Sequence, residues 1–181
     1  DEEHNAVIKE RRNGQGAEVA GVTVEGKVAY LSLVQLQAGV TWQKSHYTRP
    51  EKWSKDSSVP AEKRIFRTPD WYGYFTATYS PVKPLNIALS GTYTGSMIVQ
   101  HMKGYIPKDM AVTTPDFFDM NLKISYDFSL YKFITLQLNA GVQNIFNAYQ
   151  RDFDQGKERD SGYIYGPSMP RSYFAGAKLM F

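Results

Sequence analysis

The sequence predicts an all-β chain whose strands form an antiparallel sheet that crosses a membrane as part of a β-barrel. Three observations support this fold class. Apolar and polar residues alternate with a period of two in seven separate runs, no sustained pattern has the helical period of 3.6, and short connections alternate with long ones. The mean hydropathy is −0.45, and no apolar run approaches the roughly 18 residues of a membrane-spanning helix. Alternating strands are compatible with this polar average, because only one of their faces is apolar.

Each alternating run is about ten residues long, the length that a tilted strand needs to cross the bilayer. The expected strands are 20–30, 34–43, 71–80, 85–94, 118–128, 134–143 and 173–181. In the same order, their apolar faces carry Val22, Val24 and Val28; Val34, Leu36 and Val40; Trp71, Phe75 and Tyr79; Leu85, Ile87 and Leu89; Phe118, Leu122 and Ile124; Ile134, Leu136 and Leu138; and Tyr173, Leu179 and Phe181.

The connections between these strands come in two sizes that alternate along the chain. Tight turns are expected near Ser32, at 81–84 and at 129–132. The long loops hold 29 of the 39 Asp, Glu, Lys and Arg residues of the chain. Long loops at one end of a sheet and tight turns at the other are typical of outer-membrane barrels. The expected long loops are 1–16, 46–70, 101–116 and 148–171.

Aromatic residues make up 14% of the chain, with 13 Tyr, 10 Phe and 3 Trp. Many of them lie toward the ends of the apolar faces, where an amphipathic ring suits the interface between lipid and water. Members of this set are Tyr30, Trp42, Trp71, Tyr79, Tyr93, Tyr126, Phe128, Tyr173 and Phe181.

Seven is an odd number of strands, whereas single-chain bacterial barrels close with an even number. A barrel must close so that no strand edge meets lipid. We therefore expect the chain to be the last part of a larger barrel and to begin within a surface loop.

Two motifs stand in the C-terminal third. The first comprises Val142, Gln143, Asn144, Ile145, Phe146, Asn147 and Tyr149, and the second comprises Gly166, Pro167, Pro170, Arg171, Tyr173, Gly176 and Phe181. Together they resemble the last two strands of TonB-dependent outer-membrane receptors, and segment 152–167 resembles receptors of this family from the Bacteroidota. The resemblance covers the whole chain as the C-terminal seven strands of a 22-stranded barrel. It also assigns Tyr173 and Phe181 to the signal read by the barrel-assembly machinery.

This resemblance implies active import of a scarce ligand, such as a ferric siderophore, haem or cobalamin, across the outer membrane of a Gram-negative bacterium. The partners it implies are outer-membrane lipid, the TonB complex and a candidate surface lipoprotein. Neither the plug domain nor the TonB box of the family is visible in the sequence, so contact with TonB is expected through an N-terminal part outside this chain. Two alternatives stay open: a passive porin-type channel and a soluble carbohydrate-binding β-sandwich.

The loops carry the candidate ligand-binding residues. In loop 46–70, aromatic and basic residues suit an anionic or aromatic ligand, or else the aromatic residues pack on each other. In the last loop, alternate carboxylates suit either a calcium ion or ion pairs with Arg151, Lys157, Arg159 and Arg171. The candidates are His46, Tyr47, Trp53, Arg64 and Arg67; His101 and Tyr105; and Asp152, Asp154, Tyr163 and Tyr165.

No catalytic group of residues is recognisable. The histidines lie in or beside different loops, there is no cysteine, and no glycine-rich phosphate loop precedes a helix. We predict no enzyme activity, no cofactor and no metal site. The net charge of +3 is small and mixed, so nucleic acid is not an expected partner.

Overall fold

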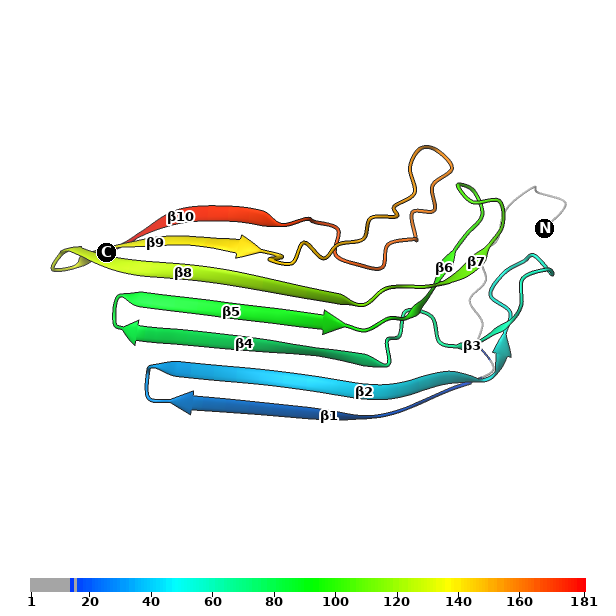
Figure 1. The fold of residues 1–181 in the computed structure, drawn as a ribbon, viewed down its shortest axis with the longest axis horizontal. Coiled ribbons are helices and arrows are strands. Elements are labelled where there is room, and N and C mark those ends of the chain that lie inside the picture. The colour runs from blue at the N-terminus through cyan, green and yellow to red at the C-terminus, as the bar shows by residue number, and fades with distance from the viewer. Residues whose placement is uncertain (1–13, 15) are drawn as a thin grey trace.

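A computed structural model describes residues 14 and 16–181, and the part of the chain that it describes contains only strands, turns and irregular segments (Figure 1). No helix among the described residues is long and apolar enough to cross a membrane. The expected loop at 1–16 lies largely outside the described residues. The strands are β1 (Ala17–Tyr30), β2 (Val34–Glu51), β3 (Glu62–Arg64), β4 (Trp71–Val82), β5 (Leu85–Thr94), β6 (Ile98–His101), β7 (Met110–Thr113), β8 (Phe117–Tyr131), β9 (Ile134–Gln143) and β10 (Ser172–Met180).

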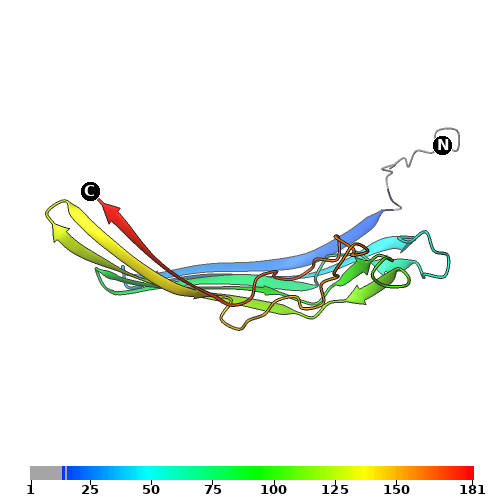
Figure 2. The ribbon, with the colours of Figure 1, turned by 90° about the horizontal axis from the view of Figure 1, so that it is seen from above.

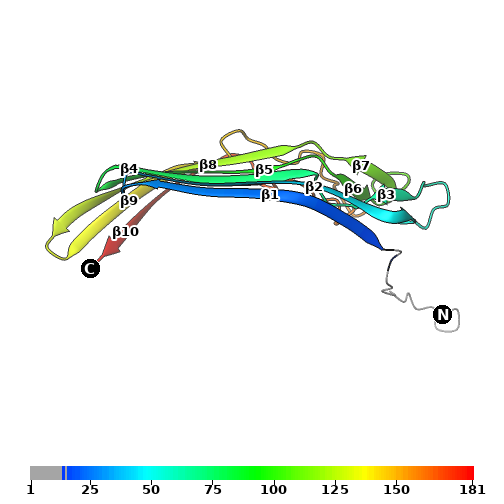
Figure 3. The same ribbon diagram turned by 90° about the horizontal axis from the view of Figure 1, so that it is seen from below.

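Seven long antiparallel strands form the main sheet in the order β1-β2-β4-β5-β8-β9-β10, with the short β3 paired to β2. Each of the seven predicted strands is confirmed. The hairpin β6–β7 forms a separate two-stranded sheet. The main sheet is a curved single layer (Figure 2). Tight turns lie at one end, which we call the turn end, and β3, β6, β7 and the long connections lie at the other, the loop end (Figure 3).

The register of the strands places the predicted apolar residues on one continuous face. A single row across the sheet crosses all seven long strands and contains only apolar or aromatic side chains, whereas a neighbouring row on the opposite face is polar over five strands. The apolar row is Val28, Leu36, Ala77, Leu89, Leu122, Val142 and Tyr173, and the polar row is Lys27, Gln37, Thr76, Ser90 and Asn121. We call these the apolar face and the polar face.

Neither face of the main sheet is covered. The accessible surface is 13351 Å², against about 8,900 Å² for a compact protein of this mass. Val22, Val24 and Val28 on the apolar face are 61%, 63% and 66% exposed. The buried hydrophobic residues lie instead at the loop end, where they are Met97, Ile98, Val99, Phe117 and Tyr163.

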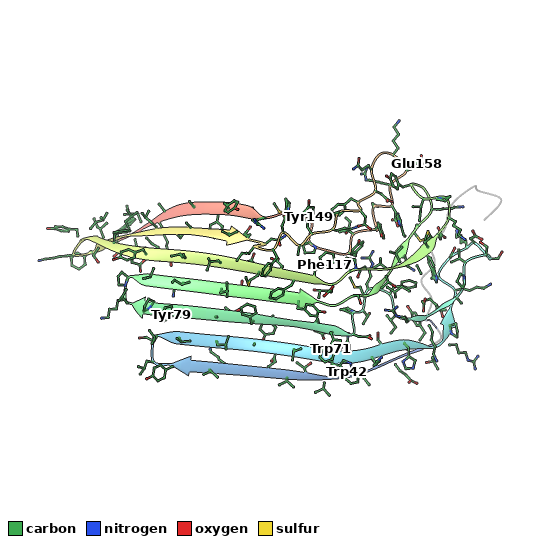
Figure 4. All side chains as sticks on the ribbon, viewed as in Figure 1. Trp42, Trp71, Tyr79, Phe117, Tyr149 and Glu158 are labelled. Atoms are coloured by element: carbon green, nitrogen blue, oxygen red, sulfur yellow. The ribbon has the colours of Figure 1, made fainter. Side chains whose placement is uncertain are left out.

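Aromatic side chains form two bands on the apolar face. Trp42 and Trp71 lie toward the loop end with ring centroids 6.4 Å apart, and Tyr79 lies at the turn end of β4 (Figure 4). Near the turn end Tyr126 and Phe128 are also in contact, with centroids 4.6 Å apart. Trp71 and Tyr79 are eight residues apart, or about 27 Å along the strand. This spacing is comparable to the apolar band of roughly 25 Å that membrane barrels present to lipid.

Side-chain hydrogen bonds between strands stabilise the polar face. The Gln37 amide donates to the Tyr74 hydroxyl at 3.2 Å, and that hydroxyl donates to Glu25 at 3.1 Å. Gly39 makes room for this chain of bonds, because a Cβ there would lie 2.7 Å from the Tyr74 ring. Farther along the sheet, Gln137 donates to Asp127 at 2.7 Å. Side chains of the polar face therefore interact with one another across strands.

The structure corrects two of the expected loop boundaries. Strand β2 continues to Glu51 and pairs with β3, so the first part of segment 46–70 belongs to the sheet. Residues 98–113, expected to be partly an extended loop, fold into the β6–β7 hairpin. Apolar and polar residues do not alternate cleanly in the last part of β2 or in the β6–β7 hairpin, so the periodicity of the sequence did not reveal these strands.

Candidate ligand-binding site in the loops

Three connections at the loop end contact one another and form what we call the loop cluster: residues 52–70, 95–116 and 144–171 (Figure 1). Its centre is a small hydrophobic core of Met97, Val99 and Tyr163, with Val112 and Tyr165 packed against it. Val99, in β6, is completely buried. The hairpin β6–β7 thus packs against the last connection.

His101 at the end of β6 connects the hairpin to the last connection. Its Nε2 lies 3.0 and 2.9 Å from the two carboxylate oxygens of Asp154, and its ring stacks on Tyr163 with centroids 3.7 Å apart. Both side chains of the pair are buried, with exposures of 9% and 2%. Asp154 also accepts the backbone N–H of Asp160 at 2.9 Å. The pair holds two loops together in a water-excluded contact.

Asp152 accepts hydrogen bonds from two tyrosines of the same connection. The hydroxyl of Tyr163 donates at 2.9 Å and that of Tyr165 at 2.5 Å. Burial and the bond to Asp152 raise the pKa of Tyr163 to about 12, and the same causes raise the pKa of Tyr165 further. Burial alone would raise the pKa of Asp152, but the bonds from Tyr165 and Tyr163 outweigh it and lower that pKa. The trio favours an ionised carboxylate between two neutral phenols.

Gln150 is the most deeply buried polar residue of the loop cluster, at 1% exposure. Its amide nitrogen donates to the carbonyl of Tyr163 at 3.1 Å, and its amide oxygen accepts the backbone N–H of Tyr165 at 2.9 Å. These bonds replace the strand pairing that residues 163–165 lack. The side chain therefore fixes the backbone that carries both tyrosines.

Asn144 stabilises the start of the last connection. It adopts a left-handed backbone conformation with φ of 51°, which asparagine tolerates better than most residues. Its side-chain amide donates to the carbonyls of Ala148 and Met169 at 3.1 and 3.0 Å and accepts the N–H of Ala148 at 2.8 Å. The two ends of the connection are thereby joined just above β9.

Arg67 links the connection 52–70 to the other two. Its backbone N–H donates to the carbonyl of Ile98 at 2.8 Å. Its guanidinium donates to the carbonyls of Ile164, at 2.7 Å, and Gly162. This predicted ligand residue therefore has a structural contact with the backbone of the last connection.

A cavity of about 600 Å³ opens between connections 52–70 and 95–116, and we call it the Trp53 pocket. It is lined by Trp53, Lys55, Asp56, Met102, Lys103 and Asp109. The ring of Trp53 packs edge-on against Phe66 at 5.3 Å, and its Nε1 donates to the carbonyl of Pro60 at 3.2 Å. This volume lies in the range of small-molecule sites, and the aromatic ring and thioether provide an apolar wall.

The two acids of the Trp53 pocket are already engaged by donors. Asp109 accepts the Ser54 hydroxyl at 2.5 Å and the backbone N–H of Lys103 at 2.7 Å, and Asp56 accepts the N–H of Ser58 at 2.9 Å. Neither Lys55 nor Lys103 forms an ion pair with another described residue. The lining therefore offers a ligand two ammonium groups and an apolar wall. The two carboxylates keep their negative charge, because their hydrogen bonds lower the pKa values of both acids, so the formal charges of the lining sum to zero.

The hydrogen bonds at Asp109 predict an acid-induced opening of the loop cluster. The Ser54 hydroxyl and then the Lys103 N–H lower the pKa of Asp109 from its ordinary value of 3.8. Because the pKa is lower in the folded state, the ionised Asp109 stabilises the fold, and this stabilisation is fully present above the ordinary pKa. The stabilisation is lost as the pH falls through the lowered pKa. Below pH of about 4, hydrogen exchange in segments 52–58 and 103–110 should therefore accelerate. In the Ser54→Ala variant the acceleration should begin at higher pH; an unchanged profile would contradict the assignment.

The sequence-predicted residues fall into separate groups in the structure. Trp53 lines the pocket, while Arg67, His101, Asp154, Tyr163 and Tyr165 support the loop cluster. His46 lies on β2, not in a loop, 3.4 Å from Glu18. It is paired there with Arg64 of β3, and Tyr47 is also on β2. Tyr105 is 57% exposed at the tip between β6 and β7.

The expected ion pairs of the last connection are wrong for the described residues. Asp154 binds His101, Asp152 binds the two tyrosines, and Asp160 accepts the backbone N–H of Met102 at 2.8 Å. Arg151 instead lies over the Tyr149 ring at 5.2 Å. No group of three or more His, Cys, Asp or Glu side chains among the described residues could hold a metal ion. Asp154 and Asp160 bind groups of another connection, which proximity in the sequence does not indicate.

The sequence did not indicate the structural roles of Gln150, Ser54 and Asp109. Asn144 was noted only as a member of the first C-terminal motif. All four are engaged by residues far along the chain or by backbone groups. Asn144 and Asn147 have positive φ values of 51° and 56°. Their residue type could have indicated a turn at this point, because asparagine is favoured in left-handed backbone conformations.

Comparisons with known proteins show a likeness of fold. No family model and no curated protein sequence matches the chain. Among solved structures, the chain is similar to the closed form of the ferric-catecholate import receptor Fiu from E. coli K12, with a TM-score of 0.62 and 21% identity. It is also similar to a structure of the FpvAI–pyocin S2 complex, with a TM-score of 0.60 and 15% identity. Each match covers 91% of this chain, but only 21% and 19% of the respective matched chains.

Proposed function

We propose that this chain forms part of the barrel wall of a TonB-dependent outer-membrane receptor that imports a ferric siderophore. The observation that carries the proposal is the apolar row that crosses all seven long strands, with a polar row beside it on the other face. A sheet of this kind requires lipid on one side and a polar interior on the other. The fold likeness to Fiu and the two C-terminal motifs support the family.

In this proposal the loop end is extracellular and the turn end is periplasmic, because long loops of outer-membrane barrels lie outside the cell. TonB acts through a segment outside this chain. Tyr173, 73% exposed on the apolar face, and Phe181, 97% exposed beyond β10, form the signal for the barrel-assembly machinery. Outer-membrane lipid covers the apolar face, and a surface lipoprotein is a further candidate partner.

The ligand is captured by the Trp53 pocket. Its apolar wall favours a flat or aromatic group, and Lys55 and Lys103 favour negative charge. A ferric catecholate complex has both properties, and in this proposal it contacts the ammonium groups of Lys55 and Lys103 rather than the carboxylates of Asp56 and Asp109. Haem and cobalamin remain alternative ligands that the same assay distinguishes.

Two alternatives receive less support. A β-sandwich buries one face of each of two sheets, whereas the described long strands expose both faces of one sheet. A passive channel shares the wall but needs no ordered loop cluster, and the buried pair His101–Asp154 and the buried Gln150 are costly to maintain without a role for the loops.

Binding of radiolabelled ferric tris-catecholate to membranes containing the receptor tests the ligand proposal. We expect Trp53→Ala to weaken binding by about 2- to 12-fold, because a lost contact between aromatic rings costs roughly 0.5–1.5 kcal/mol. Lys103→Met should weaken binding while leaving the backbone bond to Asp109 intact.

Lys157→Met, an exposed change in the last connection, is the control and should bind normally. Unchanged binding in both pocket variants would overturn the assignment of the pocket. Tight binding of haem or cobalamin, but not of the catecholate, would replace the ligand and leave the barrel assignment intact.

A further inference from the structure

Two residues of the Trp53 pocket, Met102 and Lys103, lie at the tip of the β6–β7 hairpin, where the pairing of β6 with β7 has ended. Carboxylates hold their backbone N–H groups instead. Lys103 donates to Asp109 at 2.7 Å, and Met102 donates to Asp160 at 2.8 Å. Asp109 lines the pocket, but Asp160 belongs to the last connection and is not among the lining residues. One wall of the pocket therefore depends on a residue outside it.

Asp160 is itself held in place within the last connection. Its second carboxylate oxygen accepts the N–H of Gly162 at 2.8 Å, and its own N–H donates to Asp154 at 2.9 Å. Asp154 in turn binds the ring of His101, the residue before Met102. Two adjacent residues of the hairpin are thus bound by two acidic residues that are joined by a hydrogen bond of their own.

The backbone of the last connection also supports the hairpin tip directly. A Cβ at Gly104 would collide with the carbonyl oxygen of Glu158, so the two segments lie in contact immediately after the wall residues. Glu158 lies at the loop end, on the last connection (Figure 4). The wall formed by Met102 and Lys103 is therefore backed by a connection that contributes no side chain to the pocket.

We infer that Asp160 is a positioning residue of the Trp53 pocket, through which the last connection controls the ligand affinity of that pocket. The inference rests on the proposed function of the pocket. If a wall is in place in only a fraction of the molecules, the apparent Kd rises by the inverse of that fraction. Removal of the Asp160 carboxylate should lower this fraction, because Met102 then has no acceptor for its N–H.

Binding of ferric tris-catecholate to the full receptor in membranes tests the inference. We expect Asp160→Ala to weaken binding by about 3- to 10-fold, because it removes a hydrogen bond to a charged acceptor that holds the wall. The change of charge alone has the opposite sign, since the loss of a carboxylate favours an anion. Asp160→Asn keeps one acceptor oxygen and should lie between Asp160→Ala and the wild type.

Glu158→Ala is the matched control, because it removes an exposed carboxylate from the same connection. The Glu158 side chain forms no ion pair with another described residue. This variant should bind at least as tightly as the wild type. Equal weakening in Glu158→Ala and Asp160→Ala would overturn the inference, because the effect would then follow the charge and not the hydrogen bond to Met102.

A double-mutant cycle separates positioning of the wall from general loosening of the loop cluster. In a background that lacks both wall side chains, Met102→Ala with Lys103→Met, Asp160→Ala should weaken the remaining binding by less than about twofold. In the Trp53→Ala background it should keep its full effect, because Trp53 lies in another connection. Equal effects in the two backgrounds would assign Asp160 a general structural role and overturn the inference.

Amide hydrogen exchange gives a readout that needs no ligand. Exchange in residues 102–104 should accelerate at least about tenfold in Asp160→Ala, while β8 and β9 keep their protection. Because coupling between two sites is reciprocal, saturating ferric tris-catecholate should slow exchange in residues 154–162 of the wild type. Normal exchange at 102–104 in Asp160→Ala overturns the inference whatever the ligand.

The binding assays distinguish failure of this inference from failure of the proposed function. If Trp53→Ala and Lys103→Met both bind normally, the assignment of the pocket fails and the inference fails with it. If those two variants bind weakly while Asp160→Ala and Asp160→Asn bind like the wild type, the pocket stands and only the role of Asp160 is overturned.

Discussion

Leu89→Arg should block assembly of this sheet into membranes. Leu89 lies in the middle of β5 on the apolar face, between Ala77 of β4 and Leu122 of β8. An arginine on the lipid-facing midplane of a membrane barrel costs about 2–4 kcal/mol. The measurement is the fraction of protein that becomes protease-resistant in lipid vesicles at increasing urea concentration.

Ser90→Arg is the matched control, since it introduces the same charge one residue farther along the same strand. Ser90 lies on the polar face, between Thr76 and Asn121. We expect this variant to assemble like the wild type. Leu136→Arg and Gln137→Arg repeat the comparison on β9. Equal tolerance at positions 89 and 90 would show that the faces are assigned incorrectly.

Gln150→Leu should disorder the last connection while leaving the main sheet intact. The substitution removes the bonds to the Tyr163 carbonyl and the Tyr165 N–H and leaves both backbone groups buried without partners. The local cost is about 2–3 kcal/mol, so amide hydrogen exchange in residues 150–166 should accelerate roughly 30- to 150-fold.

Gln155→Leu in the same connection is the control, because Gln155 is exposed. It should leave exchange in residues 150–166 unchanged. Strands β8 and β9 should keep their wild-type protection in both variants. Normal exchange in Gln150→Leu would mean that the buried amide does not order the loop cluster.

The strands were predictable from the sequence because successive side chains point alternately to the apolar face and to the polar face. Leu85, Ile87 and Leu89 alternate with Asn86, Ala88 and Ser90, and this alternation determines which face each side chain occupies, because a slip of one residue would move the apolar set to the other face. The chain crosses the apolar band seven times, and each crossing repeats the same signal.

The loop cluster was not predictable in the same way, because its contacts join residues far apart in sequence. His101 and Asp154 are 53 residues apart, and Ser54 and Asp109 are 55 apart. The alternate acids Asp152 and Asp154 suggested either one calcium site or local ion pairs, yet Asp152 accepts from tyrosines and Asp154 binds His101. Trp53, a predicted ligand residue, lines a pocket that also depends on Met102 and Lys103 from another connection.

We propose that the apolar face meets lipid and that the polar face does not. The chain has no cysteine, so single cysteines can be placed at positions 85 to 94 and spin-labelled without background. In membranes, we predict high collision rates with oxygen at positions 85, 87, 89 and 93, and high collision rates with a water-soluble nickel chelate at positions 86, 88 and 90. Accessibility without a period of two, or with the opposite phase, would contradict the account.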